Sequence, residues 1–116
     1  MLYGFQEGGS TGAFPESGLI FDEHGILYGT TTSAVYNGSA TGNVFRMKPP
    51  VRKGGSWAFS VLYNFKGVSN GDSDGAYPTG NLIFGKGGGL YGTTLEGGTG
   101  QTCGYAGCGT SFEVFP

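Results

Sequence analysis

Charged side chains are scarce in this sequence of 116 residues: six are basic, eight are acidic and a single histidine is present. The basic residues are scattered from Arg46 to Lys86. They form no patch of the kind that binds the phosphates of a nucleic acid. The sequence therefore argues against a nucleic-acid partner.

Long apolar runs and helical periodicity are also missing. No apolar run approaches the ~18 residues that a membrane-spanning helix needs, and no stretch repeats apolar residues with the period of a helix. The first residues, Met1–Phe5, have neither the basic nor the apolar region of a signal peptide. We expect no membrane span, and we expect the chain to be a segment of a longer protein.

Glycine and aromatic residues, in contrast, are abundant. The chain has 26 glycines, and aromatic residues make up 15% of it. Each glycine opposes a helix by up to ~1 kcal/mol, whereas aromatic residues favour strands. Disordered chains have few aromatic residues and many charges. The composition therefore predicts a folded, all-β protein.

The sequence also contains an internal repeat. Leu19-Ile20-Phe21 and the following Leu27–Thr31 return 63 residues later as Leu82-Ile83-Phe84 and Leu90–Thr94. Short apolar blocks in a long period indicate a repeat architecture, in which each unit buries one face against its neighbour. We divide the chain into a first repeat with its linker, residues 1–61, and a second repeat, residues 62–116.

Each repeat predicts short strands separated by glycine-rich turns. The strands expected in the first copy are 18–21, 26–31, 43–48 and 57–65, and those in the second are 81–84, 89–94 and 110–115. Four antiparallel strands per unit are typical of a β-propeller blade. Leu2–Phe5 matches Leu62–Phe65. We therefore expect two β-propeller-like blades, one complete and the other split between the termini.

The repeated blocks resemble a known family of tandem repeats. Leu-Tyr-Gly-Thr-Thr at 27–31 and 90–94, Gly-Leu-Ile-Phe-Asp at 18–22 and Cys-Gly-Thr-x-Phe at 108–112 are similar to the Gloeo-Verruco (GloVer) repeat. The resemblance implies an extracellular or cell-surface protein of a bacterium, built from many such repeats. It implies no established activity. Two blades cannot close a ring, so further repeats of the parent chain or self-association are the expected partners.

Two motifs have side chains that could bind or bridge. Cys103 and Cys108 are separated by a short, glycine-flanked loop and predict a structural disulfide, with free thiols as the alternative. Asn70–Gly75 begins like a calcium loop, with Asp72 and Asp74 as ligands, but Asn81 stands where a bidentate glutamate is needed. We expect a solvated turn there and no bound metal, and a calcium site stays open.

The long loops of both repeats are predicted to emerge at one end of the sheets, opposite the tight turns. Binding residues concentrate in such loops. The residues expected to meet a ligand are Tyr36, Asn37, Asp72, Asp74, Gln101 and Tyr105.

No catalytic constellation is present. We therefore predict a non-catalytic extracellular repeat module, without a cofactor, that has a structural or an adhesion-type recognition role, with surface glycans among its partners. Two alternatives stay open: a glycan- or calcium-binding propeller module, and part of a propeller enzyme whose active site needs further blades.

Overall fold

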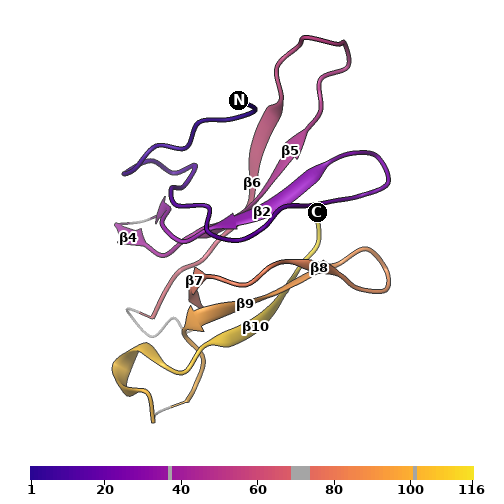
Figure 1. Ribbon diagram of the computed structural model, residues 1–116. Helices are drawn as coiled ribbons and strands as arrows, with labels where there is room; N and C mark the ends of the chain where they lie inside the picture. Colours follow the sequence, from indigo (N-terminus) through magenta and orange to yellow (C-terminus); the bar gives the residue numbers. More distant parts are fainter. Residues whose placement is uncertain (37, 69–73, 101) are drawn as a thin grey trace.

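The computed structural model describes residues 1–36, 38–68, 74–100 and 102–116, and for Tyr36 only the backbone. The chain is all-β, as predicted, apart from a single short 3₁₀ helix in the described residues. Two four-stranded antiparallel sheets lie one above the other and do not close into a ring (Figure 1). Among the described residues no helix could cross a membrane.

The first sheet has the strand order β1-β2-β5-β6, and β3 and β4 form a separate hairpin. In the second sheet β9 lies in the centre, with β10 on one side and β7 and β8 on the other. The elements are β1 (Ile20–Phe21), β2 (Leu27–Thr31), β3 (Val35–Tyr36), β4 (Ser39–Ala40), β5 (Asn43–Lys48), β6 (Ala58–Asn64), β7 (Ala76–Pro78), β8 (Ile83–Phe84), β9 (Leu90–Glu96), η1 (Gly104–Ala106) and β10 (Thr110–Val114).

The sequence repeat is also a structural repeat. The β1–β2 turn is closed by the Asp22 amide donating to the Ile26 carbonyl, and the β8–β9 turn by the Gly85 amide donating to the Gly89 carbonyl. The second hydrogen bond is the counterpart of the first, because its donor and acceptor each lie 63 residues further along the chain, the same offset that separates Gly18 from Asn81. The two β-hairpins are therefore copies of one another in register as well as in sequence.

A conserved close approach explains one glycine in each copy. A Cβ on Gly29 would lie 2.7 Å from the Phe45 ring, and one on Gly92 would lie 2.5 Å from the Phe112 ring. Real Cβ atoms do not come this near, so only glycine lets the aromatic ring of the neighbouring strand pack this closely against the backbone.

Each sheet has two faces, which we call front and back. The front face carries Leu19, Leu27, Phe45 and Met47 in the first sheet and Leu82, Leu90, Phe112 and Val114 in the second. The back face carries Ile20, Tyr28, Thr30 and Val44 in the first sheet and Ile83, Tyr91, Thr93 and Ser111 in the second. Alternation along each strand separates the two sets.

The core forms where the back face of the first sheet packs on the front face of the second. Tyr28, Val44, Phe65, Leu82 and Leu90 are its buried members. The Phe65 and Phe112 rings meet edge to face, with centroids 5.0 Å apart. The repeats are therefore stacked in the same sense, back to front, and not face to equivalent face.

The N-terminal segment differs from the prediction that Leu2–Phe5 is a strand of the second sheet. It forms no strand, and its rings pack on the front of the first sheet, where Phe5 meets Phe45 with centroids 5.3 Å apart. Tyr3 stacks on Phe59 at 4.2 Å. The predicted split blade is not formed within this chain, because the half-buried Tyr3 and Phe5 side chains pack on the first sheet.

Strand β7 was not predicted, although it is part of the repeat. Ala76 pairs with Glu96, and its counterpart Ala13 forms an isolated bridge with Ser33. The next residues, Phe14 and Tyr77, have positive φ angles of 56° and 57°. A positive φ is rare for aromatic residues, so its recurrence marks a structural motif, Gly-Ala-aromatic-Pro.

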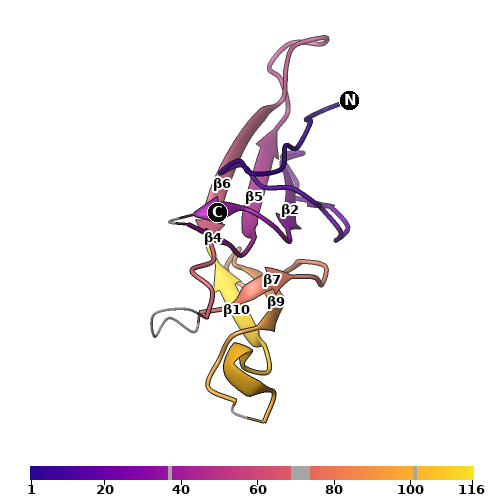
Figure 2. The same ribbon diagram turned by 90° about the vertical axis from the view of Figure 1, so that its left-hand side faces the viewer.

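The linker between β5 and β6 is a long hairpin that extends away from the second sheet (Figure 2). Because β6 pairs with β5 along its length, the first sheet continues to Asn64. The boundary between residues 61 and 62 lies within this strand.

Candidate functional site

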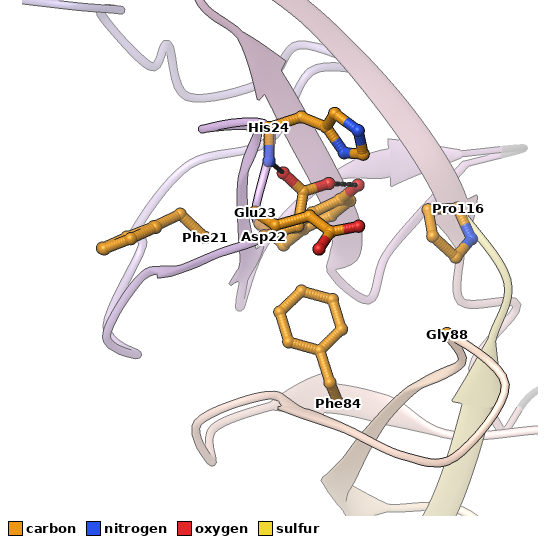
Figure 3. Close-up of a pocket in the computed structure, with 8 residues that line it drawn as sticks. Phe21, Asp22, Glu23, His24, Phe84, Gly88 and Pro116 are labelled. Carbon is orange, nitrogen blue, oxygen red and sulfur yellow. Dashed lines mark hydrogen bonds between the residues drawn. The ribbon is translucent and has the colours of Figure 1, made fainter.

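A groove lies between the β1–β2 turn and the second sheet (Figure 3). Its volume is about 460 Å³, and it is lined by Phe21, Asp22, Glu23, His24, Tyr28, Phe84, Gly88 and Pro116. Three consecutive polar residues of one turn thus face the aromatic ring of another repeat. The groove lies at the turn end of the sheets and not at the loop end.

Asp22 organises the polar side of this groove. Its carboxylate accepts hydrogen bonds from the backbone amides of His24 (2.9 Å) and Ile26 (3.0 Å) and from the Tyr28 hydroxyl (3.1 Å). Desolvation raises the pKa of this carboxyl, but the three hydrogen bonds outweigh it, so the pKa is lowered from 3.8. Asp22 therefore stays ionised at neutral pH and is unsuited to donate a proton.

Tyr28 joins the turn to the core. Its ring is 3% exposed and meets Phe84 edge to face at 5.6 Å. Desolvation, the hydrogen bond to Asp22 and the charge of Asp22 raise the pKa of the hydroxyl, and Arg46 opposes this only in part. Tyr28 is thus a fixed, neutral donor that orients Asp22.

The remaining lining residues are available to a ligand. Glu23 and His24 are exposed, and the Phe84 and Phe21 rings are 40% and 70% exposed. Polar groups beside exposed aromatic rings are the usual composition of a small-molecule site. The groove could accept hydrogen bonds from ligand hydroxyls while an aromatic ring packs against the ligand's apolar face.

The loop end of the sheets carries the residues that the sequence singled out. Asn37, Asp72 and Gln101 lie outside the described residues. Tyr36 is in β3, and its side chain is likewise outside the description. Of the six side chains, the structure thus describes only two, those of Asp74 and Tyr105.

Asp74 and Tyr105 have different environments. Asp74 accepts hydrogen bonds from the Tyr63 hydroxyl and from the Lys66 amide, the latter at 3.0 Å, so its carboxylate is fixed against the segment that follows β6. Tyr105 lies in η1 and is fully exposed. A groove of about 210 Å³ at this end of the sheets is lined by other residues, including Tyr77 and Glu96.

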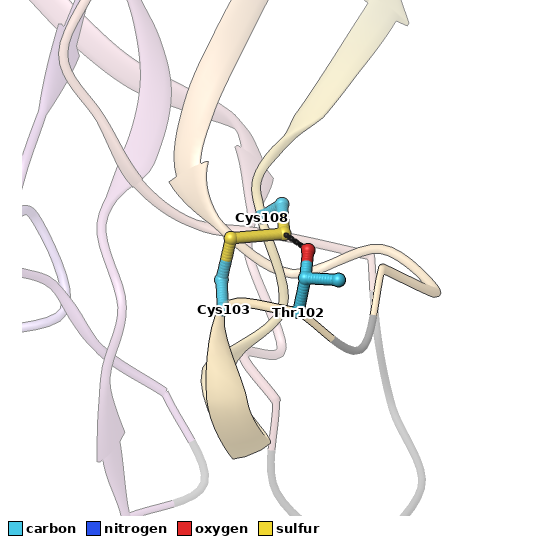
Figure 4. Close-up of a disulfide and its surroundings, with 3 residues drawn as sticks. All are labelled: Thr102, Cys103 and Cys108. Carbon is cyan, nitrogen blue, oxygen red and sulfur yellow. Dashed lines mark hydrogen bonds between the residues drawn. A yellow bond between two sulfur atoms is a disulfide. The ribbon is translucent and has the colours of Figure 1, made fainter.

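The predicted disulfide is confirmed. Cys103 and Cys108 are bonded, with Cα atoms 5.2 Å apart (Figure 4). The loop that they close also has backbone hydrogen bonds from the Gly97 amide to Ala106 and from the Gly109 amide to Gly97. The bridge therefore ties the β9–β10 loop, next to the exposed Tyr105.

Metal ligands do not gather in the described part of the chain. Within it, no three His, Cys, Asp or Glu side chains lie close enough to hold an ion.

Comparisons with protein-family models, with curated proteins and with solved structures find no match.

The groove was not predicted from the sequence. A usable signal was present: the Asp-Glu-His turn has no counterpart in the second copy, where Gly85, Lys86 and Gly87 stand at the equivalent positions. The partner ring, Phe84, could not be assigned, because its neighbour is set by the stacking of the sheets.

Proposed function

We propose that this chain is a non-catalytic, extracellular repeat module of a bacterial cell surface, with a structural and adhesion-type recognition role, in a propeller-like array. The observation that carries this proposal is how the repeated side chains are used. The recurring side chains Leu82, Leu90 and Tyr28 pack one repeat against the next. The polar groups that do not recur gather around one aromatic groove.

The disulfide supports the extracellular part of the proposal. Bridges of this kind persist in oxidising compartments and are rare in the cytosol. The GloVer-like blocks of the sequence agree with a surface location.

A glycan is the ligand class that the groove favours. The exposed Phe84 ring offers an apolar stacking surface, and Asp22 and Glu23 offer acceptors to sugar hydroxyls beside it. Asp22 is held ionised by its three hydrogen bonds, which suits an acceptor and not a general acid.

The test is a glycan array followed by calorimetric titration of the best ligand. We expect Phe84→Leu, which keeps an apolar side chain against Tyr28 but removes the ring, to weaken binding about tenfold, and Glu23→Gln to weaken it less. Tyr105→Leu, at the opposite end, is the matched control and should bind as the wild type does. Loss of binding in Tyr105→Leu but not in Phe84→Leu would move the site to the loop end; an array without ligands would refute a recognition role for glycans.

A further inference from the structure

Each sheet has a front face and a back face that can pack on another sheet, but the contact inside the chain uses only one face of each sheet. The back of the first sheet is covered by the front of the second. The front of the first sheet and the back of the second lie at opposite ends of the stack. The free front face of the first sheet corresponds to the packed front face of the second sheet, and the free back face of the second sheet corresponds to the packed back face of the first.

The apolar residues of the front face show the difference most clearly. Leu82, on the front of the second sheet, is 1% exposed, whereas its counterpart Leu19 is 49% exposed. Pro78 is buried next to Gly42, whereas its counterpart Pro15 is exposed. The same side chains are thus core in one copy and surface in the other.

The back face shows the complementary difference. Tyr28 is 3% exposed, and its counterpart Tyr91 is 37% exposed. Ile83, on the same face, is 64% exposed. A groove of about 310 Å³ runs over this surface, lined by Asn81, Ile83, Tyr91, Gly92, Thr93, Ser111 and Phe112. In the first sheet the equivalent positions receive Leu82 and Phe84 of the second repeat.

The N-terminal segment provides independent support. Phe5 lies on Phe45 as Phe65 lies on Phe112, and Tyr3 meets Phe5 edge to face at 5.0 Å as Tyr63 meets Phe65 at 5.3 Å. Residues 2–5 thus occupy, on the front of the first sheet, the place that the end of β6 occupies on the second. That is where the last strand of a preceding repeat would end.

We propose that two copies of this chain dock head to tail. The front of the first sheet of one copy then packs on the back of the second sheet of the other copy. Leu19 and Phe21 of one copy then fill the groove beside Ile83 and Tyr91 of the other. The Thr93 hydroxyl of one copy donates a hydrogen bond to the Pro15 carbonyl of the other, as the Thr30 hydroxyl donates to the Pro78 carbonyl at 3.5 Å within the chain. The β10 edge of one copy comes to lie along residues 2–5 of the next, as β5 lies along β6.

This arrangement is heterologous, so a dimer still has one front face and one back face free, and association continues into a ring or an open array. It is weaker than the internal contact for two reasons. Gly18 stands in place of Asn81, so the side-chain hydrogen bond between Asn81 and the Gly18 amide (2.7 Å) has no equivalent. Ser111 replaces the buried Val44. We expect a dissociation constant of about 10 µM to 1 mM.

The experiment is sedimentation velocity over a concentration series. The wild type should form species beyond the dimer as its concentration rises. Leu19→Arg blocks the front face and Ile83→Arg the back face, so each variant alone should stay monomeric. An equimolar mixture should form a one-to-one heterodimer, because each variant keeps the surface that the other needs. Val51→Arg, at a fully exposed position of the β5–β6 hairpin, is the control and should associate as the wild type does.

Three results would overturn the proposal: a wild type that is monomeric at about 1 mM, a mixture that stays monomeric, or single variants that still associate. Circular dichroism and melting of each variant confirm that it is folded, and both substituted side chains are exposed. The proposal rests on the repeat character that also underlies the proposed function. The two fail separately, because monomeric Ile83→Arg keeps every residue of the turn-end groove and can be titrated with glycans by itself.

Discussion

Tyr28 and Tyr91, at equivalent positions of β2 and β9, both donate a hydrogen bond to a carboxylate, but the carboxylate comes from a different part of each repeat. Tyr28 donates to Asp22, which precedes it in its own hairpin. Glycine replaces this carboxylate in the second copy, and Tyr91 donates instead to Glu113 of the neighbouring strand. The pKa of Tyr91 is raised by that hydrogen bond, with desolvation and the Glu113 charge acting in the same direction. The tyrosine–carboxylate hydrogen bond therefore recurs in both repeats, whereas the position of the residue that supplies the carboxylate does not.

The Asp22 carboxylate makes stability depend on pH. Because its pKa is lowered in the folded state, the stabilisation is complete above the ordinary value of 3.8 and is lost as the pH falls through the folded-state pKa. We expect Asp22→Asn to cost about 1 kcal/mol at neutral pH and to reduce the loss of stability on acidification. Urea unfolding at a series of pH values measures both.

Glu16→Gln, at an exposed position before β1, is the control for the loss of one negative charge. It should leave the acid dependence as it is in the wild type. An Asp22→Asn variant with the same acid dependence as the wild type would show that the turn does not depend on the carboxylate.

The elements of the second repeat are held at their two ends by different means. At the turn end, backbone hydrogen bonds such as Gly85 to Gly89 close the hairpin. At the loop end, the disulfide closes the segment between β9 and β10. The part between the two cysteines is short and carries the exposed Tyr105, so the bridge orders residues that have few buried side chains of their own.

Removal of the bridge should therefore destabilise the loop and leave both sheets folded. The chain-entropy model assigns about 2 kcal/mol to a loop of this length. We expect the double variant Cys103→Ser, Cys108→Ser to lose about that much stability in urea unfolding, with the β-sheet circular dichroism retained. Dithiothreitol should have the same effect on the wild type and none on the double variant. A double variant as stable as the wild type would show that the Gly97 and Gly109 hydrogen bonds suffice.

The whole molecule is a back-to-front stack with a shared core, so the two sheets depend on one another. Leu82 and Leu90 of the second sheet are buried in one cluster with Tyr28 and Val44 of the first sheet and with Phe65, which follows β6. The Leu19 side chain, at the free end of the stack, is 49% exposed. Two leucines at equivalent sequence positions thus contribute differently to folding.

Leu82→Ala should cost about 2–5 kcal/mol, because it opens a cavity between the sheets, and Leu19→Ala should cost less than about 1 kcal/mol. Both are measured by urea unfolding at low protein concentration, where self-association does not contribute. We expect a single transition in each case. Equal costs for the two variants, or separate transitions for the two sheets, would contradict the shared core.

Much of the fold followed from local pattern. The strands around Leu27–Thr31, Asn43–Lys48 and Leu90–Thr94 and the turns between the hairpin strands were predicted within a few residues, because alternation and glycine placement act over short distances. Strand β7 was missed because it has only three residues and lies inside a loop-like segment. The groove was missed because Phe84 and His24 are 60 residues apart.

The repeat, the strands, the tight turns and the cysteine pair can be derived from the order of residues, since each depends on near neighbours in the chain. The choice of which face meets which cannot. Leu19 and Leu82, or Tyr28 and Tyr91, stand in the same local sequence and differ in burial, because burial depends on contacts with a distant segment. Stacking of the sheets alone decides that Phe84 faces the Asp22 turn, and that Leu19 and Ile83 are left at the surface.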